Sequence, residues 1–167
     1  MQDEEKIRDP LCFVPIGIIH SPFTDIMGMP IQPNGARGIR GRVEISAEYA
    51  EGLRDIEGFS HLFLIYAFHC CPSYQLTVRP FLDNTPRGVF ATRAPRRPNA
   101  IGLSIVRLIE VKGSTLFIED VDILDGTPLI DLKPYVPVFD AYPAASSGWL
   151  EHSAQNAGTF RSDERFR

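Results

Sequence analysis

The chain is poor in cysteine: only Cys12, Cys70 and Cys71 occur among its 167 residues. Three is an odd number, and no CxxC spacing is present, so neither a disulfide framework nor a zinc ribbon is expected. We therefore expect no metal site, and we expect all three thiols to be buried and inert.

The chain also lacks long apolar runs and the common nucleotide and hydrolase motifs. No stretch of about 18 apolar residues and no secretory signal occurs, which predicts no membrane contact and a reducing, cytoplasmic setting. There is no GxGxxG after a strand, no Walker loop, no HExxH and no GxSxG elbow. A dinucleotide-binding fold and the familiar hydrolase sites are thus disfavoured.

Charge is unevenly distributed. The net charge is −4, so no overall basic field attracts nucleic acid. Residues 79–107, however, hold six arginines and one aspartate, whereas residues 110–140 hold seven acidic residues and two lysines. This segregation favours a local anion site. The alternative is that the charges lie on solvated strand faces, and charge alone does not separate the two interpretations.

Short strand patterns dominate the order of elements. Strands are expected at 13–19, 39–45, 59–69, 76–79, 89–92, 101–111, 115–123 and 128–132, with a short helix at 47–54 capped by Ser46. With 44% hydrophobic residues in a chain of this length, the pattern predicts a mainly all-β fold, a small single β-barrel with one or two short helices. The expected division is a flexible tail at 1–12, the barrel at 13–142, and a C-terminal extension at 143–167 that is partly mobile.

The segment from Gly88 to Ser104 is the most informative part of the chain. It holds Arg93, Arg96 and Arg97 beside two prolines and Asn99. The prolines exclude a helix interior and a central strand. A stiffened loop dense in guanidinium groups fits an anionic ligand, because each guanidinium is a planar donor fork for phosphate or carboxylate.

Three other segments offer polar groups. Asp125-Gly126 is typical of a tight turn that could present a carboxylate, although a plain turn is the simpler interpretation. His69 ends the most apolar run and is favoured as a structural or substrate-contacting residue over a metal ligand. Loop residues 30–35, stiffened by two prolines, carry Gln32 and an asparagine, which is compatible with ligand contact or with surface turn chemistry.

Four segments together resemble the TsaA/TrmO-like family. They are 15–23 (PIGIIHSPF), 58–69 (GFSHLFLIYAFH), 88–103 with its arginines, and 125–135 (DGTPLIDLKPY). The resemblance runs from about residue 13 to 142. It implies a small, dimeric β-barrel that uses S-adenosylmethionine to methylate N6 of threonylcarbamoyladenosine beside the anticodon of tRNA.

The resemblance also implies site residues. Cofactor contacts are implied at eleven positions: Pro30, Ile31, Gln32, Phe68, His69, Arg93, Leu103, Asp125, Gly126, Thr127 and Pro128. Substrate contacts are expected from Arg96, Arg97, Asn99 and Tyr135, with Phe90 or Tyr135 available to stack on a base. His69 and Asp125 are the candidates to accept the N6 proton. Two alternatives stay open: a β-barrel RNA-binding module without chemistry, and an enzyme that uses the same cofactor on a small acidic metabolite.

Overall fold

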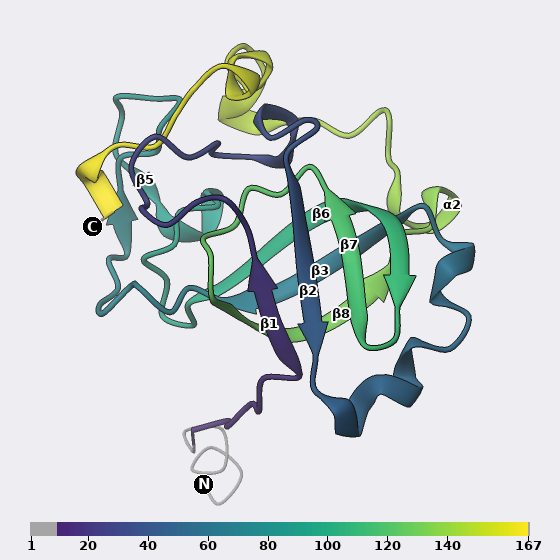
Figure 1. Ribbon diagram of the computed structural model, residues 1–167. Helices are drawn as coiled ribbons and strands as arrows, with labels where there is room; N and C mark the ends of the chain where they lie inside the picture. Colours follow the sequence, from purple (N-terminus) through teal and green to yellow (C-terminus); the bar gives the residue numbers. More distant parts are fainter. Residues whose placement is uncertain (1–9, 167) are drawn as a thin grey trace, which may run out of the picture.

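Six antiparallel strands close into a barrel in this computed structural model, which describes residues 10–166 (Figure 1). Their order around the barrel is β1–β2–β7–β6–β3–β8. The strands are β1 (Gly17–His20), β2 (Arg40–Ile45), β3 (His61–Ala67), β6 (Ile101–Lys112), β7 (Thr115–Glu119) and β8 (Thr127–Pro134). The predicted all-β barrel is therefore confirmed. Most of the expected tail at 1–12 lies outside the described residues.

Alternation of side chains fills the barrel. Along β3, Leu62, Leu64 and Tyr66 are buried while the residues between them are partly exposed. Such a period of two places one face of the strand in the core. The same holds for β6, where Ser104 and Val106 point inward. The interior is otherwise aliphatic, so a serine and a tyrosine at its end are conspicuous.

Most helical segments are short 3₁₀ turns. They are η1 (Pro33–Gly35), η2 (Ala47–Leu53), η3 (Ile56–Gly58), η4 (Val89–Ala91), η5 (Gly148–Leu150), η6 (Ala154–Gly158) and η7 (Glu164–Phe166); the α-helix is α2 (Pro137–Asp140). The helix expected at 47–54 is η2, but the Ser46 side chain makes no capping hydrogen bond. None of the helices within residues 10–166 is long and apolar enough to cross a membrane.

A small second sheet lies outside the barrel. It pairs β4 (Thr77–Val78) with β5 (Arg87–Gly88). The strand predicted at 89–92 is wrong: Val89–Ala91 form η4, and Thr92 follows it as the C-cap. Val89 is almost fully buried in a small apolar cluster, and its carbonyl oxygen accepts bonds from the Thr92 N–H and hydroxyl. This local pairing satisfies the backbone without a neighbouring strand.

The strand predicted at 115–123 ends early, at Glu119. Asp120 has a φ of +69°, which is outside the strand region. Its carboxylate accepts the backbone N–H of Gly38 at 2.8 Å, which holds this turn against the loop before β2. The turn carries the next residues, including Asp122, out of the barrel wall and toward the site described below.

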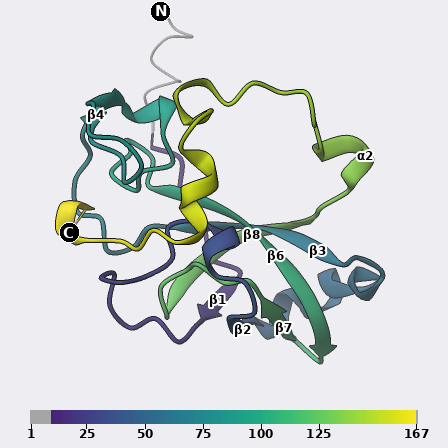
Figure 2. The ribbon, with the colours of Figure 1, turned by 90° about the horizontal axis from the view of Figure 1, so that it is seen from above.

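The C-terminal extension folds back onto the loops at one end of the barrel (Figure 2). A backbone bridge joins Arg161 to Pro30. Phe166 is buried with Val78, Val89 and Ala94. The mobility expected for residues 143–167 stays a prediction.

The expectation of buried thiols is wrong. Cys12 and Cys70 are exposed, and Cys71 is partly exposed. Cys70 and Cys71 follow β3 in a loop that bends across the mouth of a cavity, where burial is incomplete. Partial burial raises the pKa of Cys71.

Candidate active site

A cavity of about 800 Å³ opens at the end of the barrel where β3 ends and β6 begins. Five further segments surround it: loop 26–34, residues 80–82, the arginine loop 92–97, residues 122–127 after β7, and the C-terminal extension. This volume is in the upper part of the usual range for ligand sites, roughly 300–1,000 Å³. The cavity can therefore hold a cofactor-sized molecule together with part of a second ligand.

A chain of hydrogen bonds lines the barrel side of the cavity. The Ser104 hydroxyl donates to the Asp122 carboxylate at 2.7 Å, and the Tyr66 hydroxyl lies 3.1 Å from the same serine oxygen. Because serine has a single proton and gives it to Asp122, Tyr66 donates to Ser104. Tyr66 and Ser104 are buried, and Asp122 is partly buried.

The environment shifts the proton affinity of Asp122. Burial raises its pKa to about 6, against the opposing effects of the Ser104 hydrogen bond and the positive charge of Arg93. Burial also raises the pKa of Tyr66, so that this hydroxyl stays protonated. Asp122 is thus a carboxylate that changes protonation state close to neutral pH, as a general base does.

A glycine makes room for this arrangement. Gly102 pairs with Tyr66 across β3 and β6, and a Cβ at Gly102 would overlap the tyrosine ring. A register shift between β3 and β8 at Ile65 and Tyr66 also turns the strand at this point. Edge-on packing against Phe68, with ring centroids 5.4 Å apart, fixes the ring from the other side.

Arg93 and Gln32, which lie 61 residues apart in sequence, meet at the cavity. The Arg93 guanidinium donates to the Gln32 side-chain oxygen at 2.9 Å. Both residues were predicted as cofactor contacts, and both line the cavity. Arg93 is exposed, so its remaining donors are accessible to a ligand carboxylate or phosphate.

Arg97 has a different role within the same loop. Its guanidinium donates to the carbonyl oxygens of Val89 and Thr92, at 3.1 and 2.8 Å. It also lies over the ring of Phe90, 5.7 Å from the centroid. Arg97 therefore holds the arginine loop in shape by capping backbone carbonyls, while still lining the cavity.

Asp125 does not face the cavity. Its carboxylate accepts the Ser21 backbone N–H at 3.1 Å and lies 3.2 Å from His20 Nδ1. These two contacts hold the pKa of Asp125 below its usual range. The predicted turn is present, since Gly126 has a φ of +75°, and the Asp125 carboxylate links the turn before β8 to the end of β1. The cofactor contact of Asp125 stays a prediction.

The predicted residues divide into two groups. Those that line the cavity are Pro30, Ile31, Gln32, Phe68, His69, Arg93, Arg97, Leu103 and Thr127. Among the residues that the structure describes, those that do not line it are Arg96, Asn99, Asp125, Gly126, Pro128 and Tyr135. Tyr135 does pack edge-on against Phe63, which lines the cavity. No group of three or more metal-ligating side chains occurs within residues 10–166.

Sequence reasoning missed Tyr66, Ser104 and Asp122. A signal was present for Ser104, because it occupies an inward position in a strand whose other inward residues are glycine and valine. Asp122 fell near the end of the strand expected at 115–123. It lies far from Tyr66 in the sequence, and no local pattern indicates that it contacts Ser104. Only the closure of the barrel brings them together.

Comparison with known proteins fits this architecture. A family model described as the tRNA-methyltransferase O N-terminal domain matches residues 18–141. The chain belongs to this family. The match spans the barrel, the arginine loop and the residues around Asp122.

Individual relatives and a solved structure are similar to this chain over most of its length. The chain is 54% identical over 156 residues to a probable S-adenosyl-L-methionine-binding protein of Pyrococcus abyssi, covering 93% of this chain and 85% of the relative. It is 38% identical to the tRNA (adenine(37)-N6)-methyltransferase of Escherichia coli, covering 83% of this chain and 63% of that enzyme. The crystal structure of TrmO from Pseudomonas aeruginosa superposes with a TM-score of 0.72 at 38% identity, covering 84% of this chain and 63% of that one.

Proposed function

We propose that this chain transfers a methyl group from S-adenosylmethionine to N6 of adenine 37 in tRNA. The proposal rests on the cavity of a chain that belongs to this family. The cavity wall carries Asp122, whose pKa is raised to about 6, and the exposed guanidinium of Arg93. The names of the relatives supply the reaction and the substrate.

The cavity residues suit this cofactor. S-adenosylmethionine combines a carboxylate, an ammonium, a sulfonium and an adenine, and it supplies an electrophilic methyl carbon. Arg93 and Gln32 offer donors for the carboxylate, and Asp122 offers a negative charge for a cationic centre. Phe68 and Leu103 offer apolar surface for a base.

We assign Asp122 as the general base that accepts the N6 proton. The N6 lone pair would attack the methyl carbon while the carbon–sulfur bond breaks and its electron pair goes to sulfur, so that a neutral thioether leaves. N6 loses its proton in the same step, and the electron pair of the N–H bond remains on nitrogen. The Asp122 carboxylate accepts that proton. Ser104 holds the carboxylate in place by its hydrogen bond, and Tyr66 in turn bonds Ser104. Alignment of the reactants within the cavity supplies the rest of the acceleration.

The earlier candidates fit this role less well. Asp125 points at His20. His69 is exposed at the cavity mouth, with its Nδ1 at 3.5 Å from the Thr127 hydroxyl. A histidine in this place is better suited to contact with the substrate.

More specifically, we propose that the adenosine at position 37 carries an N6-threonylcarbamoyl group. That group ends in a carboxylate, for which Arg93 and Arg97 lie on the same wall. A tRNA substrate also implies a cytoplasmic place of action. Its phosphates would contact the arginines of residues 79–107.

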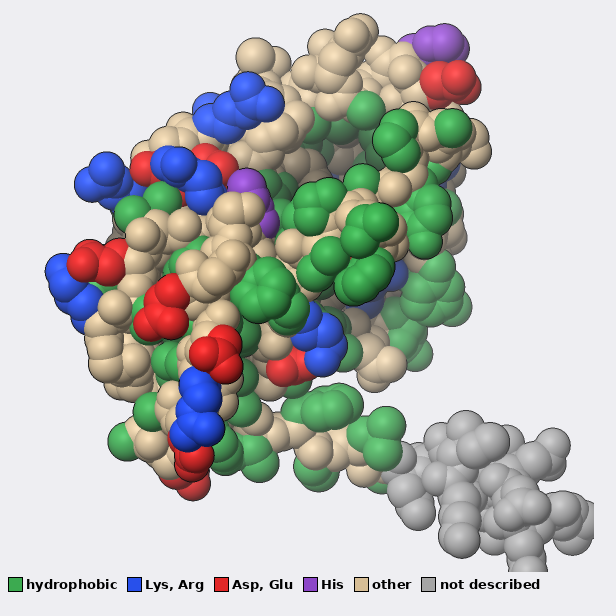
Figure 3. Space-filling view, turned by 90° about the vertical axis from the view of Figure 1, so that its right-hand side faces the viewer, with side chains coloured by type: hydrophobic (Ala, Val, Ile, Leu, Met, Phe, Trp, Pro, Cys, Tyr) green, Lys and Arg blue, Asp and Glu red, His purple; other side chains and the backbone are tan. Residues whose placement is uncertain are grey.

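We further propose a homodimer. Outward-facing residues of β6 are unusually apolar for an exposed strand: Ile101, Leu103, Ile105 and Ile109 are all at least 36% exposed. The first three also line the cavity, so the proposed interface borders the ligand site. Figure 3 shows hydrophobic side chains gathered on the α2 side of the molecule. Such a patch is typical of protein interfaces. Sedimentation velocity should give twice the monomer mass, and Ile109→Lys should shift the chain to monomers.

The decisive experiment for the activity is methyl transfer in vitro. Labelled S-adenosylmethionine is incubated with the chain and with tRNA that carries or lacks the threonylcarbamoyl group. We expect label in the modified tRNA only. Label in both tRNAs would overturn the proposal that the substrate is threonylcarbamoyladenosine. Binding of tRNA without any transfer of label would favour an RNA-binding module. Transfer to a small acidic metabolite alone would favour the other alternative.

A further inference from the structure

The C-terminal segment 148–166 forms one wall of the cavity, although it lies beyond the matched family domain, which ends at residue 141. Trp149, Leu150, Ala154, Ala157 and Ser162 of this segment line the same cavity as Asp122 and Arg93. Figure 2 shows the segment lying beside the loops at the end of the barrel.

One end of this wall is bonded to loop 26–34. The Ser162 N–H donates to the Met29 carbonyl at 2.9 Å, and the Gly28 N–H donates to the Ser162 carbonyl at 3.0 Å. The Ser162 hydroxyl donates to the Ile26 carbonyl and accepts the Met29 N–H. These bonds satisfy backbone N–H and C=O groups of loop 26–34, as hydrogen bonds to a neighbouring strand would do in a sheet.

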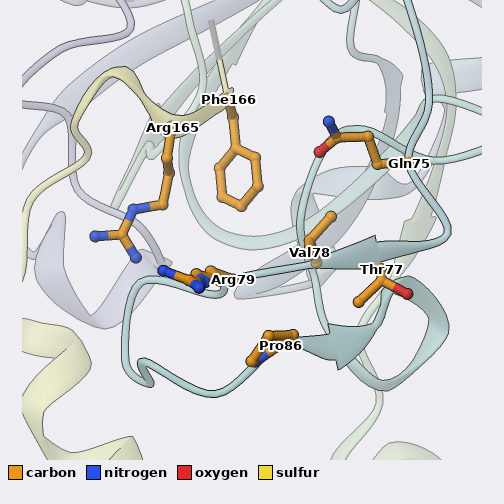
Figure 4. A pocket seen from close by; sticks show the side chains of 7 residues that line it. All are labelled: Gln75, Thr77, Val78, Arg79, Pro86, Arg165 and Phe166. Carbon is orange, nitrogen blue, oxygen red and sulfur yellow. The ribbon is translucent and has the colours of Figure 1, made fainter.

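The segment is also bonded to η4, which leads directly into the arginine loop. The Trp149 indole N–H donates to the Ala91 carbonyl at 2.8 Å, and the Arg87 guanidinium lies 5.5 Å from its ring centroid. Near residue 166 the chain docks on the small sheet, where Figure 4 shows Phe166 directed toward Val78. Arg165 donates to the Pro80 carbonyl at 2.8 Å.

The two loops held in this way are the ones that carry Gln32 and Arg93. Neither loop is a strand of the barrel, so the barrel alone does not set the distance between them. We propose that residues 148–166 are part of the ligand site: they fix the two loops at the separation needed to bind S-adenosylmethionine and cover the bound molecule with Trp149. This inference rests on the proposed function.

The physical basis is preorganisation. A loop that is ordered before binding loses less conformational entropy when the ligand arrives, so affinity is higher for the same contacts. Removing the Ser162 hydroxyl leaves the Met29 N–H without its acceptor and frees loop 26–34. The effect should appear in ligand affinity more than in the stability of the barrel, whose core does not include these residues.

Trp149 makes the test direct, because it is the only tryptophan in the chain. The full chain is titrated with S-adenosylmethionine by calorimetry, and the quenching of Trp149 fluorescence by acrylamide is compared with and without ligand. Ser162→Ala is the test variant. Glu151→Ala is the matched control, since Glu151 is exposed on the same segment and does not line the cavity.

We expect saturating ligand to protect Trp149 from acrylamide. Ser162→Ala should raise the Kd on the order of tenfold, while Glu151→Ala leaves it unchanged. Heat of binding with unprotected Trp149, or with the same Kd for Ser162→Ala and wild type, overturns the inference. An absence of binding heat in the wild type overturns instead the proposed cofactor, so the two failures are distinguishable.

Discussion

Replacing Asp122 by asparagine should make the protein more stable and abolish its activity. Asparagine keeps the size of the side chain and an oxygen that can accept the Ser104 hydroxyl, but it carries no charge. The change therefore removes the ionisation of Asp122 with little alteration of packing.

The magnitude follows from the pKa. Burial raises the pKa of Asp122 from 3.8 to about 6 in the folded chain, so the folded state binds this proton more tightly than the unfolded state. Above pH 7 the carboxylate is ionised in both states, and the folded state carries the full cost, up to about 3 kcal/mol at 1.36 kcal/mol per pKa unit. As the pH falls from 6 to 4 the folded form becomes protonated first, and most of the cost disappears; the remainder is lost below the unfolded pKa of 3.8.

The assay is urea unfolding of both proteins at pH 7.5 and pH 4. At pH 7.5 Asp122→Asn should raise the free energy of unfolding by up to about 3 kcal/mol, and at pH 4 the difference between the two proteins should shrink to about 0.5 kcal/mol. In parallel, kcat/KM for methyl transfer in the wild type should fall below about pH 6. The variant should lose about 10²–10⁴-fold in rate at neutral pH.

Two results would refute this reasoning. Loss of stability at pH 7.5 in the variant would mean that Asp122 is a structural carboxylate whose charge is fully compensated. Retention of activity together with the acidic fall in rate would mean that another group takes the proton.

Three further predictions concern the surroundings of the cavity. Gly102→Ala should cost about 1–3 kcal/mol in urea unfolding, because the new Cβ displaces the Tyr66 ring; Gly52→Ala, where the space is open, is the control. Arg97→Lys should increase amide hydrogen exchange at residues 89–94, since a lysine cannot cap both carbonyls in the same way; unchanged exchange would contradict the capping role. Affinity for tRNA should fall at least about tenfold between 50 and 200 mM salt, and a flat response would mean that the arginines serve only the small ligand.

The barrel was predictable from the sequence because it depends on local signals. Alternating apolar residues and turn residues between short runs define β2, β3 and the β6–β7 hairpin, whose expected ranges are close to those observed. Local signals failed where tertiary contacts decide. Val89 belongs to a 3₁₀ turn and not to a strand, because its side chain is buried in a small apolar cluster. β7 ends before Asp120, whose carboxylate accepts the Gly38 N–H.

The site was predictable only in part. The arginine loop and Gln32 could be identified from composition and resemblance, and the structure joins them. The polar chain from Tyr66 to Asp122 needed three-dimensional closure, because its members lie on three separate elements. Asp125 had the stronger turn signal, yet its carboxylate is used to bond Ser21 and His20.

Calorimetric titration of the wild type and of Arg93→Ala with S-adenosylmethionine tests the central assignment most directly. The cavity bounded by Arg93, Gln32 and Asp122 should bind one molecule per chain. Arg93→Ala should weaken binding about tenfold or more through loss of the charge-assisted contact, while its circular dichroism stays that of the folded barrel. Equal affinity in the two proteins would show that the methyl donor binds elsewhere.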